Sequence, residues 1–165
     1  MNLMTCQSMT IHWHGMLQQK SPWMDGVPYL SQCPIPPMGQ FRYDFLAETE
    51  GTLFYHDHTG NVNHVRLKCT SKARDKSSDM KIDQFIGNLL RDGLNGGLIV
   101  RTPKEMNPYH DAYDYDSPCH TINVADWNHF PSDSYFPGYY LNESYIPYHP
   151  DVYLINGKGS YQVGQ

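Results

Sequence analysis

The sequence lacks the features that mark several common protein classes. Its 165 residues contain no apolar run near the roughly 20 residues that a membrane-spanning helix needs. The N-terminal stretch "MNLMTCQSMTIHWHG" has no basic start, long apolar core or small-residue cleavage site, so it is not a secretory signal. Positively charged residues are also few, with 12 Lys and Arg against 17 Asp and Glu. We therefore expect neither a membrane nor a nucleic acid as partner.

Cysteine is sparse and widely spaced. No C-x-x-C pair occurs, which disfavours a cysteine-rich zinc module. One or two disulfides remain open, and the pairing cannot be read from the sequence. The four cysteines are Cys6, Cys33, Cys69 and Cys119. The sequon Asn142-Glu143-Ser144 would matter only in an exported protein.

Long amphipathic helical patterns are scarce, and short β-forming runs take their place. Proline (12) and glycine (13) separate these runs. Strands split by turn signals predict an all-β sandwich or barrel. The expected strands cover residues 8–13, 40–46, 52–57, 96–101, 120–125 and 151–155.

A polar, proline-containing stretch follows the buried-looking strand "GGLIV" and predicts a domain boundary. We divide the chain into an N-terminal domain (1–103), a linker (104–118) and the beginning of a second domain (119–165).

Residues 61–87 do not match their surroundings. They hold half of the basic residues, and their aromatic content falls to Phe85 alone. A loop this long without structure of its own is uncommon in a compact domain. "Gly-Asn" occurs at both edges, so removing the segment would join "HDHTG" to "NLLRDG". We interpret 61–87 as an insertion or retained intron, with a lineage-specific loop as the alternative.

Two His-x-His pairs carry the chemistry that the sequence suggests. His12 and His14 lie in "TIHWHG" (10–15), and His56 and His58 lie in "TLFYHDHTG" (52–60). In a strand, residues two apart share one face, roughly 6.5–7 Å from each other. Two adjacent strands of this kind would bring four imidazoles together. Such an all-nitrogen set, without thiolate or carboxylate, favours copper or zinc.

One His-x-His alone is weak evidence, because most such histidines lie on the surface or in a satisfied core. Two pairs, each ending a β-like run and followed by glycine within two residues, point much more strongly to a metal. A dinuclear zinc hydrolase is disfavoured, because "HDHTGN" lacks the compact H-x-H-x-D-H run of those sites. We interpret the scattered histidines as ordinary polar residues: His64, His110, His120, His129 and His149.

Four stretches, in this order, carry a family resemblance: "TIHWHG", "PWMDGVPYLSQCPI" (22–35), "GTLFYHDHTG" (51–60) and "DGLNGGLIV" (92–100). They resemble the N-terminal cupredoxin domain of multicopper oxidases, in the laccase and ascorbate oxidase branch. "INVADWNH" (122–129) and "YLINGKGSY" (153–161) resemble the start of that family's second domain. The resemblance implies an all-β, cupredoxin-like (plastocyanin-like) Greek-key sandwich, incomplete here, plus the start of a second cupredoxin domain.

The resemblance also implies a function, with copper as cofactor. A family member couples one-electron oxidation of a small, phenol-like reducing substrate to reduction of dioxygen to water. His12 matches a type 2 copper ligand, and His14, His56 and His58 match type 3 ligands of the same trinuclear cluster. Asp25, in "WMDG", matches an acid thought to relay protons to the cluster; a plain turn residue is the alternative. Cys33 matches a cysteine whose disulfide partner lies outside this chain.

The sequence departs from the family pattern in one important way. The family's second pair of histidine motifs, H-x-x-H-x-H and H-C-H, does not occur in these 165 residues. The type 1 copper site and half of the trinuclear ligands are therefore missing. We expect an oxidoreductase by family whose chain alone is inactive, with a non-catalytic, truncated copper-binding cupredoxin fragment as the alternative. The resemblance implies an extracellular protein.

Overall fold

The computed structural model describes residues 1–59, 92–132 and 149–161. The expected segment 61–87 and the sequon at 142–144 lie outside these residues. In chain order the elements are β1 (Ile11–His14), η1 (Pro22–Met24), β2 (Gly51–Asp57), β3 (Asn95–Val100), η3 (Lys104–Met106), η4 (Pro118–His120), β4 (Val124–Trp127) and β5 (Val152–Ile155). The regular elements of the described residues are β-strands, and the η elements are single 3-10 turns, so the all-β prediction is confirmed. Within the described ranges, no helix has the length and apolar character to cross a membrane.

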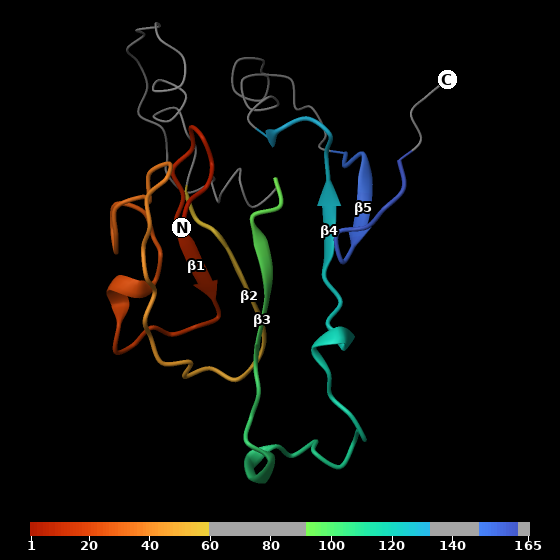
Figure 1. Cartoon of the computed structure of the whole chain (residues 1–165). Coiled ribbons are helices and arrows are strands. Elements are labelled where there is room, and N and C mark those ends of the chain that lie inside the picture. The colour runs from red at the N-terminus through yellow and green to blue at the C-terminus, as the bar shows by residue number, and fades with distance from the viewer. Residues whose placement is uncertain (60–91, 133–148, 162–165) are drawn as a thin grey trace, which may run out of the picture.

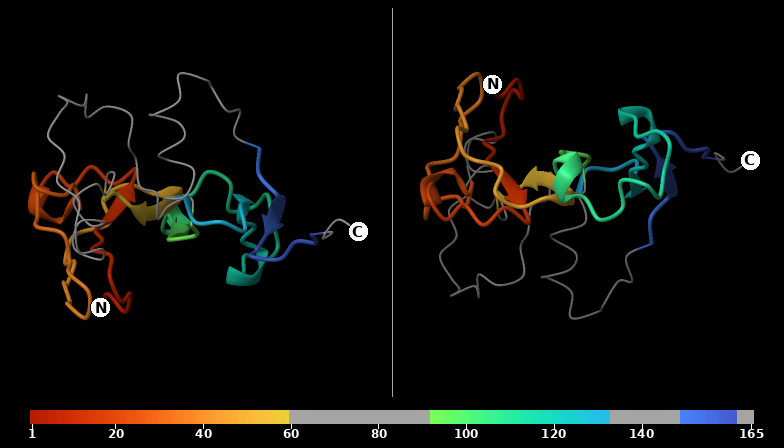
Figure 2. Two further views of the ribbon diagram at one scale, coloured as in Figure 1. Left: turned by 90° about the horizontal axis from the view of Figure 1, so that it is seen from above. Right: turned by 90° about the horizontal axis from the view of Figure 1, so that it is seen from below.

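The strands form two antiparallel sheets (Figure 1). One sheet has the order β1-β2-β3, and the other pairs β4 with β5. Seen from above and below, the two sheets lie side by side, with the β4–β5 sheet on the C-terminal side (Figure 2). A cavity of about 1320 Å³ lies between them, lined by residues that include Thr52, Ile99, Trp127 and Leu154.

The three-stranded sheet has two chemically different faces because successive side chains alternate. Trp13 lies on one face with Tyr55, and its ring contacts those of Tyr43 and Phe45 at centroid distances of 5.4 and 5.1 Å. The Tyr43 hydroxyl accepts the Ile11 N–H at 2.8 Å. Aromatic packing therefore covers this face and leaves the other to the histidines.

A glycine on β3 makes room for an aromatic ring to pack directly on the sheet. Tyr55 pairs with Gly96 across β2 and β3, and a Cβ on Gly96 would lie 2.5 Å from the Tyr55 hydroxyl oxygen. The ring thus lies directly over the backbone of β3, where only glycine leaves room.

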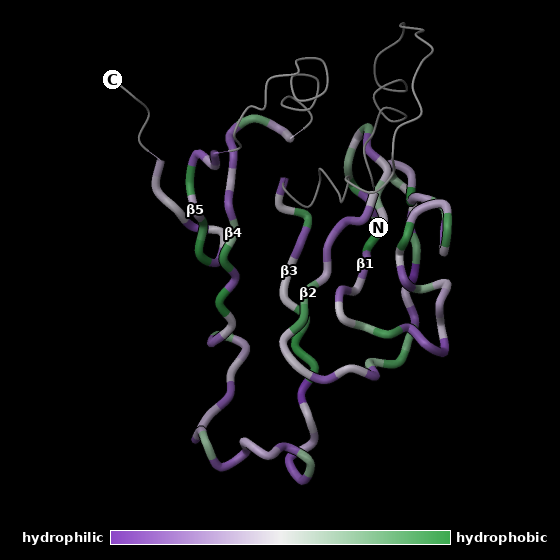
Figure 3. The backbone as a smooth tube through the Cα atoms, turned by 180° about the vertical axis from the view of Figure 1, so that it is seen from behind, coloured by the Kyte–Doolittle hydropathy of each residue, from purple (hydrophilic) through white to green (hydrophobic). Residues whose placement is uncertain are grey.

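The β4–β5 sheet is short and carries exposed hydrophobic side chains. Figure 3 shows hydrophobic residues along β5 and at the start of β4. Val124, Tyr153 and Ile155 are all more than half exposed. After β5, Asn156 and Gly157 both have positive φ, and Ile155 and Lys158 exchange two backbone hydrogen bonds across them. This is the two-residue Asn-Gly turn of a hairpin.

The expected strands 52–57, 96–101 and 151–155 are confirmed within one residue at each end. Residues 40–46 form no regular strand, although Tyr43 and Phe45 supply the aromatic packing on Trp13. The strand expected at 120–125 begins only at Val124, because the 3-10 turn η4 occupies Pro118–His120. The described thiols Cys33 and Cys119 are exposed and form no disulfide with a described cysteine.

Candidate metal centre

Antiparallel pairing of β1 with β2 sets the two His-x-His pairs beside one another. The register places His12 opposite His56 and His14 opposite Phe54. His58 directly follows β2, and its N–H donates to the Thr10 carbonyl at 3.4 Å. Because alternate residues share a face, all four imidazoles lie on the side away from Trp13 and Tyr55.

The four rings form one group, which we call the histidine cluster (His12, His14, His56 and His58). His12 is its centre, with ring centroids 5.6 Å from His14, 5.4 Å from His56 and 5.1 Å from His58. His56 also stacks against His58 at 5.9 Å. The structure thus brings together every histidine that the sequence marked as a candidate ligand.

Three members can present nitrogen atoms to one ion. Ligand atoms of His12, His14 and His56 all lie within 4.8 Å of one another. His58 contacts the same rings but is outside this three-residue group. The distances suit imidazoles that surround a common point, and imidazole nitrogen suits copper or zinc.

Hydrogen bonds fix which ring nitrogens are free. His12 Nδ1 lies 2.8 Å from the Asp25 carbonyl oxygen, and His56 Nδ1 lies 2.8 Å from the Asp57 carbonyl oxygen. A carbonyl can only accept, so both Nδ1 atoms carry the proton and both Nε2 atoms keep a lone pair. His14 Nδ1 then lies 3.3 Å from His56 Nε2. A neutral His14 with its proton on Nδ1 donates to the His56 Nε2 lone pair at this distance, and a bound cation would take the place of that proton.

Burial keeps part of the cluster neutral. The pKa of His56 and that of His58 are lowered, chiefly because burial penalises the charged imidazolium, and neighbouring histidines add repulsion. His56 is only 3% exposed, whereas His14 is open to solvent. Phe54 stacks on His14 with centroids 4.5 Å apart and covers part of that side. Neutral imidazole is the form that binds metal, so the donor set fits a copper ion.

Asp25 lies beside the cluster through the turn after η1. Its carbonyl holds His12 Nδ1, and its carboxylate Oδ1 is 3.4 Å from the same nitrogen. A turn role and a contact with a candidate ligand are therefore both present in the structure. That Asp25 relays protons stays a prediction.

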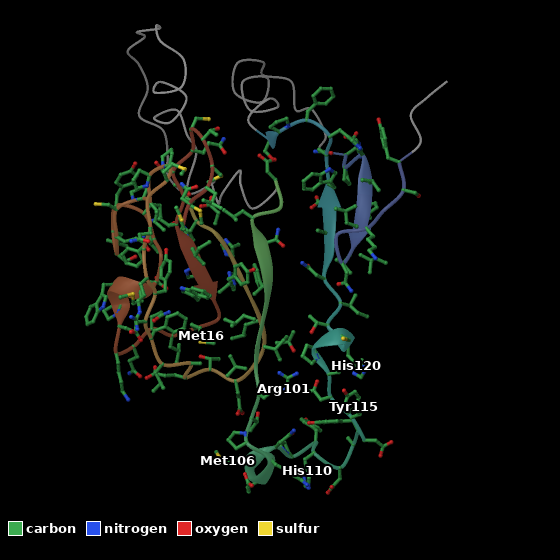
Figure 4. The ribbon with its side chains drawn as sticks, in the orientation of Figure 1. Met16, Arg101, Met106, His110, Tyr115 and His120 are labelled. Atoms are coloured by element: carbon green, nitrogen blue, oxygen red, sulfur yellow. The ribbon has the colours of Figure 1, made fainter. Side chains whose placement is uncertain are left out.

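The other described histidines lie elsewhere. Figure 4 shows His110 and His120 on the segment that joins the two sheets, away from β1. His110 contacts Asp111, His120 contacts Tyr115, and His129 pairs with Asp151 at 3.1 Å.

Sequence reasoning passed over Asp57, which is fully buried behind the cluster. Alternation of "HDH" was the available signal, because it directs the middle side chain to the packed face, where an unpaired carboxylate is rare.

Comparison with known proteins agrees with this geometry. A sequence model described as multicopper oxidase matches residues 1–68. "Laccase-2" of Thanatephorus cucumeris is 32% identical over 156 residues, which are 94% of this chain and 20% of that protein. "Multicopper oxidase MCE" of Talaromyces pinophilus is 36% identical over 163 residues, covering 92% of this chain and 22% of that protein. The chain thus spans about a fifth of the length of these curated relatives.

Solved structures show the same similarity. The multicopper oxidase Fet3p, described as functioning in iron import, superposes with a TM-score of 0.66 at 25% identity, over 94% of this chain and 24% of that one. Laccase from Botrytis aclada gives 0.63 at 28% identity, over 94% and 22%. The expected cupredoxin-like fold is confirmed by these matches. The chain belongs to the multicopper oxidase family and is laccase-like.

Proposed function

We propose that this chain is a copper-binding portion of a laccase-like multicopper oxidase. The whole protein would couple one-electron oxidation of a small, phenol-like reducing substrate to the reduction of dioxygen to water. In this proposal His12 is a type 2 copper ligand, and His14, His56 and His58 are type 3 ligands. The observation that carries it is the set of three imidazole groups whose ligand atoms lie within 4.8 Å of one another.

Hydrogen bonds and burial preorganise the histidine cluster for metal binding. The carbonyls of Asp25 and Asp57 orient two imidazoles so that Nε2 of each ring is the nitrogen that can face a metal ion. Burial holds His56 and His58 neutral, so binding there releases few protons at neutral pH. Copper bound there would supply one-electron redox chemistry.

Asp25 has the proposed role of proton carrier. Reduction of dioxygen to water consumes protons, and a carboxylate beside a ligand can hold and pass them. The Asp25 carboxylate lies 34% exposed, between solvent and the His12 ring. It can therefore exchange protons with water while it contacts His12.

We further propose that residues 1–103 form the first cupredoxin domain, 104–118 the linker and 119–165 the beginning of the second. The positions of the strands support this division, since β1 to β3 precede the linker and β4 and β5 follow it. An extracellular location is proposed from the family alone.

A second candidate function is a non-catalytic copper-binding fragment. In this reading the four histidines of the cluster hold copper as half of a trinuclear ligand set. In that case the polypeptide would hold copper without turnover.

Metal analysis with matched variants tests these proposals. Copper would be titrated into the wild-type chain, His12→Ala, His56→Ala and the control His110→Ala, whose ring lies far from β1 (Figure 4). We expect the two cluster variants to lose copper and the control to keep it. Copper with oxygen consumption supports the oxidase, and copper without turnover supports the binding fragment. Preference for zinc, or equal binding by all four proteins, would refute the copper site.

A further inference from the structure

The carboxylate of Asp57 lies between the two candidate ligands His56 and His58 in sequence but behind them in space. Asp57 has no exposed surface. Its Oδ1 accepts the Thr10 N–H at 3.1 Å and also accepts the Thr59 hydroxyl. Its Oδ2 has no hydrogen-bond partner among the described residues. A buried carboxylate with one unpaired oxygen is costly and is not explained by packing alone.

These contacts join the two segments that carry the histidine cluster. Thr10 immediately precedes β1 and lies two residues before His12. Its N–H also lies 3.3 Å from Thr59 Oγ1, while its carbonyl accepts the His58 N–H at 3.4 Å. Thr10, Asp57 and Thr59 thus form one buried polar junction between β1 and the end of β2.

The Asp57 side chain continues the strand pairing where the backbone ladder ends. The ladder pairs Ile11 with Asp57, and one residue earlier the Thr10 N–H turns to the carboxylate. Without the Asp57 carboxylate, the buried Thr10 N–H would lose its main hydrogen-bond acceptor. A slip of one residue would turn a whole His-x-His pair to the opposite face, so the register at this junction decides whether the imidazoles meet.

We propose that Asp57 is a positioning residue for the copper site. It fixes the register of the His12–His14 segment against the His56–His58 segment from the face opposite the imidazoles. This inference rests on the proposed copper-binding function. Residues that support ligands from behind commonly change metal affinity by about 10–100-fold when removed.

Copper titration against a competing chelator tests the role in Asp57→Ala, Asp57→Asn and the control Asn2→Ala. Asn2 is as deeply buried, and its side chain bonds Gln7 and Ile35 rather than the cluster strands. We expect Asp57→Ala to weaken copper binding at least about tenfold. Asp57→Asn, which keeps the acceptor oxygen, should restore binding, and Asn2→Ala should lower the unfolding midpoint without weakening copper binding.

A readout without metal separates this inference from the copper proposal. In metal-free protein, amide exchange at Thr10 should become faster in Asp57→Ala and stay slow in Asp57→Asn. Should Asp57→Ala fail to fold, Thr59→Val, which removes one donor to Oδ1, is expected to shift both measurements in the same direction. Failure of wild type to bind copper would refute the function, and Thr10 exchange would still decide the positioning role.

Unchanged Thr10 exchange and wild-type copper affinity in Asp57→Ala would overturn the inference. An equal loss of copper affinity in Asn2→Ala would also overturn it, because the effect would then follow general destabilisation.

Discussion

Gly26 is the residue where a single methyl group should disturb the histidine cluster most directly. It follows Asp25, has a φ of +79°, and approaches β1 so closely that a Cβ would lie 1.8 Å from the Ile11 carbonyl oxygen. The same Cβ would lie 3.0 Å from the His12 backbone nitrogen. Since the obstacles are backbone atoms, no rotamer change can relieve Gly26→Ala.

The expected loss has two sources. A left-handed conformation costs an alanine about 1–2 kcal/mol relative to glycine. Relief of the overlap requires the Asp25–Gly26 backbone to move off β1, which breaks the bond between His12 Nδ1 and the Asp25 carbonyl. A hydrogen bond of this kind contributes about 1 kcal/mol net. We therefore expect Gly26→Ala to lower the free energy of unfolding by about 2–3 kcal/mol.

Gly157→Ala is the matched control, because Gly157 has a similar φ of +74° and nothing within 4 Å of a built Cβ. It should lose only the conformational cost of about 1–2 kcal/mol. Guanidinium unfolding of the three proteins gives the stabilities, and copper titration gives the affinities. Gly26→Ala should bind copper more weakly, and Gly157→Ala should bind it normally. Equal stabilities and equal copper affinities in the two variants would refute the steric argument.

Three further predictions concern charge and pH. Burial raises the pKa of Asp57 from 3.8 to about 6, so the stability it contributes is present below its ordinary pKa and is lost as pH rises through 6. The free energy of unfolding of metal-free protein in urea should therefore rise for Asp57→Asn relative to wild type, by up to about 3 kcal/mol between pH 4 and pH 7. If the free energies of unfolding of the two proteins changed in parallel with pH, this prediction would be contradicted. The ring resonances of His56 and His58 should titrate below pH 6.5 in an NMR titration without metal, because burial lowers both pKa values; a midpoint at or above 6.5 would show that the rings are solvated. These histidines stabilise the fold above their ordinary pKa, and that contribution is lost as pH falls below it. Asp116→Ala should leave the thermal midpoint unchanged although Asp116 forms a two-bond ion pair with Arg101, because both groups are solvated; a clear drop in the midpoint would contradict this.

The chemistry of the site could be read from local sequence, because it depends on two short-range rules. Residues two apart on a strand share a face, and this alone put His12 with His14 and His56 with His58. The choice of metal class followed from the ligand type, since imidazole without thiolate suits copper or zinc. Strands β2, β3 and β5 were also predictable, because β-branched and aromatic runs there are bounded by glycine, asparagine or proline.

Pairing between distant segments was decided only in the folded chain. Local sequence does not state that His12 lies opposite His56, because register depends on which faces are buried together. Residues 40–46 have the composition of a strand, yet they contribute aromatic contacts to Trp13 without forming one, because tertiary packing overrides local propensity.

The sequence by itself determined the four histidines, their alternation and the all-β character of the chain. The tertiary structure decided that the Asp25 carbonyl orients His12 and that the Asp57 carboxylate is buried behind the cluster. Both facts depend on atoms brought together across long separations in the chain. Hydrogen bonding and desolvation act on distance in space, and spacing along the sequence does not fix that distance.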